Sequence, residues 1–185
     1  MRFNVPAYSQ YLDVKSRAWK RRSCGIVALK MALDHYAPNR RAAHSLSHLI
    51  AKRSRADAYI RNVGWSHRGL VRIAQRHGFR AKNYDWWGEK TTHAFSKLRQ
   101  YLAKGPLLAS IYRNLKTNAH GHLVVVTGFQ NGTVFYYDPD SKTRRGIPRR
   151  ASQAKFLRGW KRRIIVVRPP SRGYGRAGPR LRRKK

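Results

Sequence analysis

The spacing of apolar residues changes from a helical pattern to a strand pattern near the middle of the chain. In the first half, apolar residues recur at intervals of three and four, which is typical of amphipathic helices. This spacing predicts helices over about residues 24–37, 41–53, 66–77 and 91–103. Ser23 is a plausible N-cap of the first helix, and Pro38 and Gly78 are stop signals for the first and third.

Short, continuous apolar runs follow Pro106. Runs of this length between turn residues indicate buried strands. They predict strands over residues 107–112, 122–129, 133–138 and 164–167. Asn131-Gly132, between the second and third run, is a strong hairpin signal. Helices followed by antiparallel strands predict an α+β fold.

The length and composition predict one domain and a tail. A chain of 185 residues that is 41% hydrophobic can bury a core of its own. We therefore expect a folded domain over residues 1–169. From Pro169 onward the chain is rich in Pro, Gly, Ser and Arg, and this composition predicts a flexible basic tail over residues 170–185.

The charge is strongly one-sided, because 42 Lys and Arg face only 7 Asp and Glu, which gives a formal net charge of +35. Such a charge makes the compact state repel itself, and polyanions are its usual partners. Nucleic acid, an anionic membrane surface and an acidic protein all fit, and so does a general compositional bias. Trp65, Trp86 and Trp87 would stack on bases in a nucleic-acid binder, although Trp86-Trp87 fit a core or groove lining better.

The sequence offers no sign of export or of a cofactor. A single cysteine cannot form an internal disulfide, the N-terminus lacks the apolar core of a signal peptide, and no apolar run is long enough for a transmembrane helix. There is also no glycine-rich loop that would hold a phosphate. We expect a soluble cytoplasmic protein without a cofactor.

Cys24 is the only cysteine, and it stands at the predicted start of a helix. Free backbone N–H groups at a helix N-terminus lower the pKa of a thiol, and the thiolate is the nucleophilic form. Gly25 beside it would let a substrate approach the backbone closely. The alternative is that Cys24 is a small buried hydrophobic residue.

His122 begins the valine-rich strand, where a histidine can be held rigidly beside a nucleophile. It could instead be an ordinary strand-end histidine, or form a metal pair with His120, since residues two apart on a strand share a face. No third ligand is obvious nearby. His44 and His48 also lack an acidic or cysteine partner, so they fit a solvated helix face and no metal site is predicted.

Asp138 ends the third predicted strand, in front of Pro139. With a three-residue loop over residues 130–132, or with a bulge, Asp138 shares a face with His122 as its diagonal neighbour. A two-residue turn alone would put it on the opposite face. The alternative role is that of a turn-forming residue before proline.

These residue types match covalent catalysis by a thiol. An imidazole keeps the thiol ionised and later protonates the leaving amine, and a carboxylate orients the imidazole. The tetrahedral intermediate also needs donors for its oxyanion, and the backbone N–H of Cys24 is one. Gln10 is the best side-chain candidate, because an amide donates without adding charge, although it could be a surface glutamine.

Several blocks, taken in this order and spacing, carry a resemblance to a known family. They are Val5 to Gln10, Cys24-Gly25 with Met31 to Tyr36, Gly64 to His67, Gly121 to Gly128, and Tyr137-Asp138-Pro139. The chain resembles the bacteriocin-processing, double-glycine-leader type of cysteine peptidase, and more closely its stand-alone relatives, over about residues 3–169. Ile26 stands where relatives often carry proline.

The resemblance implies a papain-like fold with Cys24 as nucleophile, His122 as base, Asp138 as third member and Gln10 as oxyanion donor. It implies a peptide or protein substrate. The competing hypothesis is a catalytically dormant peptidase-like domain that binds nucleic acid or another polyanion through its basic surface and tail. We favour the enzyme, because a binding protein does not need Cys, His and Asp at these three positions.

Overall fold

The fold is built around one antiparallel sheet of six strands in the order β3-β8-β4-β5-β6-β7. The structure is a computed structural model that describes residues 2–40, 45–52 and 57–170. The strands of the sheet are β3 (Arg80–Asp85), β4 (Leu107–Tyr112), β5 (Gly121–Gln130), β6 (Thr133–Tyr137), β7 (Pro148–Ser152) and β8 (Trp160–Arg168). A separate two-stranded ladder pairs β1 (Tyr59–Ile60) with β2 (Gly64–Trp65).

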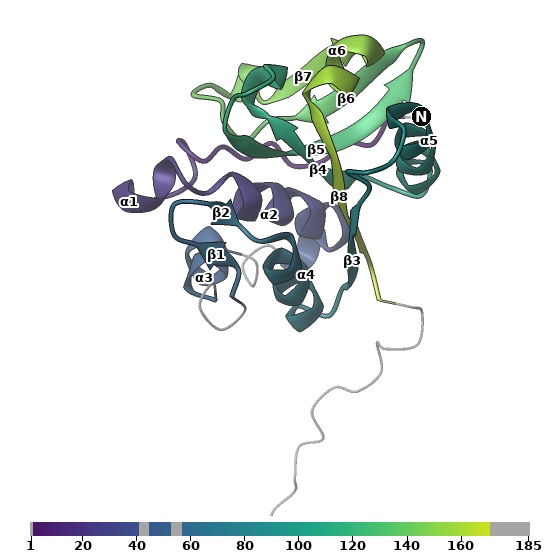
Figure 1. Cartoon of the computed structure of the whole chain (residues 1–185). Coiled ribbons are helices and arrows are strands. Elements are labelled where there is room, and N and C mark those ends of the chain that lie inside the picture. The colour runs from purple at the N-terminus through teal and green to yellow at the C-terminus, as the bar shows by residue number, and fades with distance from the viewer. Residues whose placement is uncertain (1, 41–44, 53–56, 171–185) are drawn as a thin grey trace, which may run out of the picture.

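Helices cover both faces of the large sheet. They are α1 (Arg17–Lys20), α2 (Cys24–Tyr36), α3 (Leu46–Ala51), α4 (His67–Arg76), α5 (Thr91–Leu102) and α6 (Gln153–Gly159). Figure 1 shows α2, α3 and α4 grouped in the lower half of the view and α5 and α6 in the upper half. Leu123 and Val125 belong to the core around α2, while Val124 and Val126 belong to the core around α5 and α6. Since neighbouring residues of a strand point to opposite faces, the sheet separates two hydrophobic cores.

Helix α2 is buried on all sides rather than on one face. Every residue from Gly25 to Asp34 is buried, including two charged ones. Lys30 Nζ lies 2.7 Å from Asp34 Oδ2, and the same carboxylate oxygen accepts a hydrogen bond of 2.9 Å from the Tyr8 hydroxyl. A charge can be buried when a partner is available, so this ion pair lets a helix with two charged residues occupy the core and also ties it to the N-terminal segment.

The predicted α+β class is confirmed, and so are most of the predicted elements. The second predicted helix is shorter than expected: α3 begins at Leu46, because Ser45 Oγ accepts a hydrogen bond from the His48 N–H and caps the helix there. Residues 41–44 of that prediction lie outside the described residues, as does the predicted basic tail apart from Pro170. No helix in the described part of the chain is long and apolar enough to cross a bilayer.

Strands β3 and β7 were not predicted, and both are edge strands of the sheet. Their sequences are RAKNYD and PRRAS, in which charged and polar residues outnumber apolar ones. Charged residues and proline on an edge strand prevent it from pairing with another chain. The same residues remove the apolar run from which a strand is predicted.

The buried pair of Lys30 and Asp34 gives a prediction for stability. Asp34→Ala removes the carboxylate that Lys30 binds in the core, and we expect the free energy of unfolding to fall by about 3–5 kcal/mol. The double variant Lys30→Met/Asp34→Leu removes both charges at similar volume, so it should recover most of that loss. Urea unfolding followed by circular dichroism measures both variants, and equal losses would contradict the role given to the pair.

Candidate active site

Cys24 is the first residue of α2 and is partly exposed. Ser23 occupies the N-cap position as expected, but its side chain does not cap the helix. Ser23 Oγ instead donates a 2.7 Å hydrogen bond to the carbonyl of Trp19. The Ser23 side chain therefore does not bind the N–H groups of the first turn. These N–H groups can face a thiolate or an oxyanion.

Gly25 is needed for packing rather than for the approach of a substrate. A Cβ at this position would lie 2.7 Å from Trp65 Cβ and Cγ and 3.1 Å from Leu123 Cδ1. Trp65 is itself fixed, because its Nε1 donates a 2.5 Å hydrogen bond to the carbonyl of Arg22. The expectation for Gly25 was wrong: Trp65 and Leu123 fill the space beside it, and this contact holds the start of α2 against β5.

His122 is the second residue of β5, and only 5% of it is exposed. Its Nε2 lies 2.7 Å from Asp138 Oδ1, which fixes the plane of the ring. Nδ1 is then the nitrogen left to face Cys24, whose thiol forms a hydrogen bond with this imidazole. The structure thus brings Cys24, His122 and Asp138 together from a helix start, a strand start and a strand end.

A bulge in the β5–β6 hairpin decides the face on which Asp138 lies. Gln130 pairs with Thr133, so the loop has two residues, and the expected three-residue loop is wrong. Asn131 and Gly132 have φ of 47° and 69°, as a two-residue hairpin turn of this kind requires. The register then shifts by one residue between Val126 and Gly128. This bulge, the other expected route, restores the face that Asp138 shares with His122.

Asp138 directly follows the last residue of β6 and is held by three groups. Its Oδ1 accepts the His122 bond and a 2.9 Å hydrogen bond from the Asp140 N–H, and its Oδ2 lies 3.2 Å from Arg149 Nη1. Burial alone would raise the pKa of Asp138, but the hydrogen bond and charge of His122 and the charge of Arg149 lower it below its usual value. The carboxylate is therefore ionised. Its bond to the Asp140 N–H also stabilises the turn that contains Pro139.

Cys24 and His122 stabilise each other in their charged forms. Burial opposes ionisation of the Cys24 thiol, yet the hydrogen bond and charge of His122 and the backbone N–H groups of Leu123 and Gly25 lower its pKa overall. Burial would also lower the pKa of His122, but its bonds to Asp138 and Cys24 raise that pKa to about 10. The geometry therefore favours a thiolate beside an imidazolium.

Gln10 lies beside the turn that follows Asp138. Only 3% of it is exposed, and its backbone N–H donates to the Pro139 carbonyl at 2.9 Å. Its Nε2 donates to Asp140 Oδ1 at 2.7 Å, and in the described part of the chain its Oε1 has no hydrogen-bond partner. One hydrogen of Nε2 is thus engaged, and the role of Gln10 as oxyanion donor stays a prediction.

Two residues around this site were missed by sequence reasoning. Asp140 binds Gln10, the Tyr11 hydroxyl at 2.9 Å and the Arg113 guanidinium at 2.6 Å. Arg149 binds Asp138 from β7, a strand that the sequence did not reveal. Asp140 could have been found from the scarcity of acids in the chain, whereas Arg149 is one of many arginines and carries no such signal.

His120, the histidine nearest to His122 in the sequence, has a different environment. His120 precedes β5 and is exposed, whereas His122 is buried. His44 lies outside the described residues. Among the residues that the structure describes, no three His, Cys, Asp or Glu are grouped as metal ligands.

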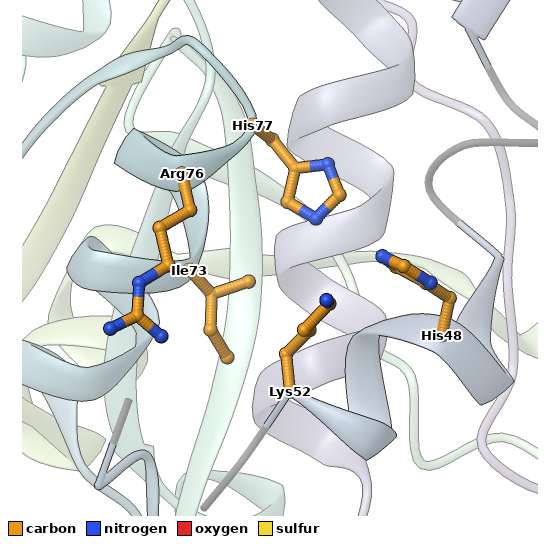
Figure 2. A pocket seen from close by; sticks show the side chains of 5 residues that line it. All are labelled: His48, Lys52, Ile73, Arg76 and His77. Carbon is orange, nitrogen blue, oxygen red and sulfur yellow. The ribbon is translucent and has the colours of Figure 1, made fainter. Parts of the chain in front are cut away.

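A cavity of about 410 Å³ lies between α3 and α4, away from Cys24. Figure 2 shows His48, Lys52 and His77 pointing toward one another there, and the two imidazole rings meet edge to face with centroids 5.7 Å apart. Lys52 and Arg76 stand at the carboxyl ends of their helices, where cations balance the helix dipole. The cavity has cations but no nucleophile, so it is not a second candidate for the same chemistry.

Several solved structures share the fold. The peptidase domain of Streptococcus ComA, a bi-functional ABC transporter involved in quorum sensing, is 23% identical with a TM-score of 0.59 over 80% of this chain and 93% of that one. A double glycine motif protease from an AMS/PCAT transporter, in complex with its leader peptide, is 18% identical with a TM-score of 0.56 over 91% and 94%. A putative C39-like peptidase from Bacillus anthracis is 15% identical with a TM-score of 0.62 over 89% and 94%.

These likenesses confirm the expected papain-like α+β fold. No curated protein sequence matches the chain. The sequence pattern of the Peptidase_C39 like family matches residues 2–164, which is nearly all of the described domain. The chain therefore belongs to the Peptidase_C39 like family.

Proposed function

We propose that the protein is a cysteine peptidase that hydrolyses peptide bonds with Cys24 as nucleophile, His122 as base and Asp138 as orienting acid. The observation that carries this proposal is the 2.7 Å bond between His122 Nε2 and Asp138 Oδ1, since it turns the other ring nitrogen toward the thiol at the start of α2. Family membership agrees with this reading.

The first half of the reaction forms an acyl-enzyme. The Cys24 thiolate attacks the carbonyl carbon of the peptide bond, and the oxygen becomes an oxyanion. Backbone N–H groups at the start of α2 and the second hydrogen of Gln10 Nε2 are its donors. The His122 imidazolium then gives its proton to the leaving amine, the C–N bond breaks, and a thioester remains on Cys24.

The second half releases the acyl group. His122, now neutral, removes a proton from a water molecule, which attacks the thioester carbonyl. Collapse of this intermediate expels the Cys24 thiolate and yields a carboxylic acid, while the imidazolium is restored. Asp138 stays ionised throughout and stabilises the imidazolium in the orientation that both steps need.

The substrate class that we propose is a peptide or protein. One structure of the same fold is described as a double glycine motif protease in complex with a leader peptide. That description concerns the transporter protein, and here it supports a peptide substrate without specifying its sequence.

Modification of Cys24 tests the proposal directly. At a pH of about 6 only roughly 0.3% of an ordinary thiol is ionised, whereas the lowered pKa of Cys24 keeps it reactive. We expect iodoacetamide and an epoxide-type cysteine-protease inhibitor each to add once to the wild type. His122→Ala should slow the alkylation at this pH roughly a hundredfold, because burial then raises the thiol pKa. Intact-mass spectrometry over time measures the adduct.

Cys24→Ala and His120→Ala are the controls for this experiment. Cys24→Ala should take no label. His120→Ala removes an exposed imidazole two residues from His122 and should react like the wild type. Slow alkylation of folded wild-type protein, at the rate of a free peptide thiol, would contradict the activated thiolate.

The role of Gln10 predicts a loss of turnover without a loss of thiol reactivity. With a fluorogenic peptide that the wild type cleaves, Gln10→Ala should lower kcat by about 10²–10³, the usual cost of one oxyanion donor. Its alkylation at pH about 6 should be unchanged. Tyr11→Phe is the matched control, since it removes another donor to Asp140 and leaves the Gln10 amide in place. Unchanged kcat in Gln10→Ala would leave the backbone as the sole source of donors.

Arg149 should act on the thiol through Asp138. Removing its charge in Arg149→Met takes away one of the groups that lower the pKa of Asp138, so this pKa rises and the hold of the carboxylate on His122 weakens. The pH at which Cys24 becomes a thiolate, followed by absorbance of the thiolate, should then rise. Arg150→Met, the neighbouring and exposed position of β7, should leave it unchanged. Equal behaviour of the two variants would show that Arg149 has no part in positioning the acid.

A further inference from the structure

The excess of positive charge has no function in the proposed peptidase mechanism. Each of the seven acidic residues already has a cationic or histidine partner, the pairs being Asp13–Arg144, Asp34–Lys30, Asp57–Arg72, Asp85–Arg163, Glu89–Lys97, Asp138–His122 and Asp140–Arg113. The chain therefore has no spare carboxylate with which to neutralise its other Lys and Arg residues. Neutralisation has to come from an anion outside the protein.

One groove combines cations with aromatic rings. It has a volume of about 470 Å³ and lies between the edge strand β3, its neighbour β8 and the carboxyl end of α5. We call it the β3–α5 groove, and its cationic and aromatic lining consists of Arg80, Lys82, Tyr84, Tyr101, Lys104 and Arg168. None of the described residues that line it is acidic.

The aromatic rings of the groove are held in place by Trp86. Tyr84 and Tyr101 are half-buried, with centroids 4.7 Å apart, and Trp86 stacks on both, at 5.6 Å from Tyr84 and 6.2 Å from Tyr101. Lys82 Nζ lies 5.2 Å from the centre of the Tyr84 ring. A fixed aromatic platform edged by ammonium groups is the arrangement that stacks bases and binds the phosphates between them.

The position of the groove adds to this argument. Arg168, at the end of β8, is fixed by the Tyr36 hydroxyl and by carbonyls of residues 101 and 106, and Arg80 Nε donates to the Pro169 carbonyl at 3.3 Å. The described chain thus ends beside the groove. Residues 171–185, which come next in the sequence, contain seven Lys and Arg and no acidic residue, so further positive charge follows the strand that lines the groove.

We propose that the β3–α5 groove binds single-stranded nucleic acid, with bases on the Tyr84 and Tyr101 rings and phosphates on Lys82, Lys104 and Arg80. Single strands fit better than duplexes, because a duplex keeps its base faces stacked inside and offers only phosphates to this surface. An acidic protein would use the cations but would have no need of the rings.

The cavity of Figure 2 is also lined by cations, and it fits this ligand less well. Its rings are imidazoles in contact with each other, and its Lys52 and Arg76 face two helix carboxyl ends that together carry about one negative charge. It is therefore useful as a control, since it offers two cations that can be removed without touching the β3–α5 groove.

The groove and the proposed active site can be occupied together. Trp160 at the start of β8 pairs with Ile111, which pairs with His122, whereas Arg168 at the other end of β8 lines the groove. A bulge lets the segment of β8 from Trp160 to Arg163 span one residue step of β4. Counted as six steps along β4 at about 3.3 Å per residue, the two sites are roughly 20 Å apart. Bound nucleic acid would then hold the peptidase in one location without covering Cys24, and binding does not depend on the proposed catalytic activity.

Fluorescence anisotropy of the full-length protein tests the proposal. The probes are labelled oligothymidylate and oligouridylate of about 16 nucleotides, a DNA duplex of the same length and polyglutamate, titrated between about 50 and 200 mM salt. We expect the single strands to bind more tightly than the duplex or polyglutamate. Lys82→Ala/Lys104→Ala should reduce the slope of log affinity against log salt by about 1.4, since each phosphate contact contributes about 0.7.

Three further variants make the result decisive. Lys52→Ala/Arg76→Ala removes the same charge from the other cavity and should keep the wild-type slope. Tyr101→Leu should weaken single-strand binding about tenfold and duplex binding little, while Tyr101→Phe should bind like the wild type. Equal losses in both double variants would mean that overall charge alone attracts the strand, and tighter binding of duplex or polyglutamate would point to another polyanion. Either result would overturn the proposal.

Discussion

The structure depends on how seven carboxylates are used among 42 Lys and Arg side chains. Several of them join segments that are far apart in the sequence. Asp13 binds Arg144 through both carboxylate oxygens at 2.6 Å, and Asp140 binds Gln10 and Arg113. These contacts hold the N-terminal segment against the turn that follows β6. Attraction within these ion pairs has to offset repulsion among the excess cations. Each of the few acidic residues therefore contributes strongly to holding the fold together.

Asp138 both joins separate strands and belongs to the candidate site. It lies between His122 and Arg149, so the same carboxylate fixes an imidazole and receives a cation from the next strand. The charges alternate in sign from Arg149 through Asp138 and His122 to Cys24. Each member favours the ionised form of its neighbour, which is how a buried site can contain this many charges.

The position of Cys24 is fixed by packing rather than by charge. Helix α2 is enclosed on all sides, and its buried charges, Lys30 and Asp34, pair with each other in the core. Trp65 and Leu123 close on Gly25, where a side chain would collide with them. A helix held in this way has little freedom to move, and the residue at its start keeps a constant position relative to β5. The basic β3–α5 groove lies at the other end of β8. The position of Cys24 thus depends on packing, whereas the groove is characterised by its charge.

The sequence by itself determined the α+β class, the main helices and the hairpin at Asn131-Gly132. It also indicated Cys24, His122 and Asp138 as the candidate catalytic residues. These follow from local rules, because apolar periodicity and turn residues act over a few positions, and because a lone cysteine and scarce acids are visible without coordinates.

Only the tertiary structure decided the rest. Both edge strands are mostly polar, and they become strands by pairing with β8 and β6, a contact between distant parts of the chain. The bulge at the Val126–Gly128 shift selects the face of Asp138, and a one-residue change of register leaves no mark on the apolar pattern. Arg149, Asp140 and the rings of the β3–α5 groove likewise acquire their partners across the fold. Pairing between distant segments depends on shape and charge in three dimensions, and the local spacing of residues does not contain that information.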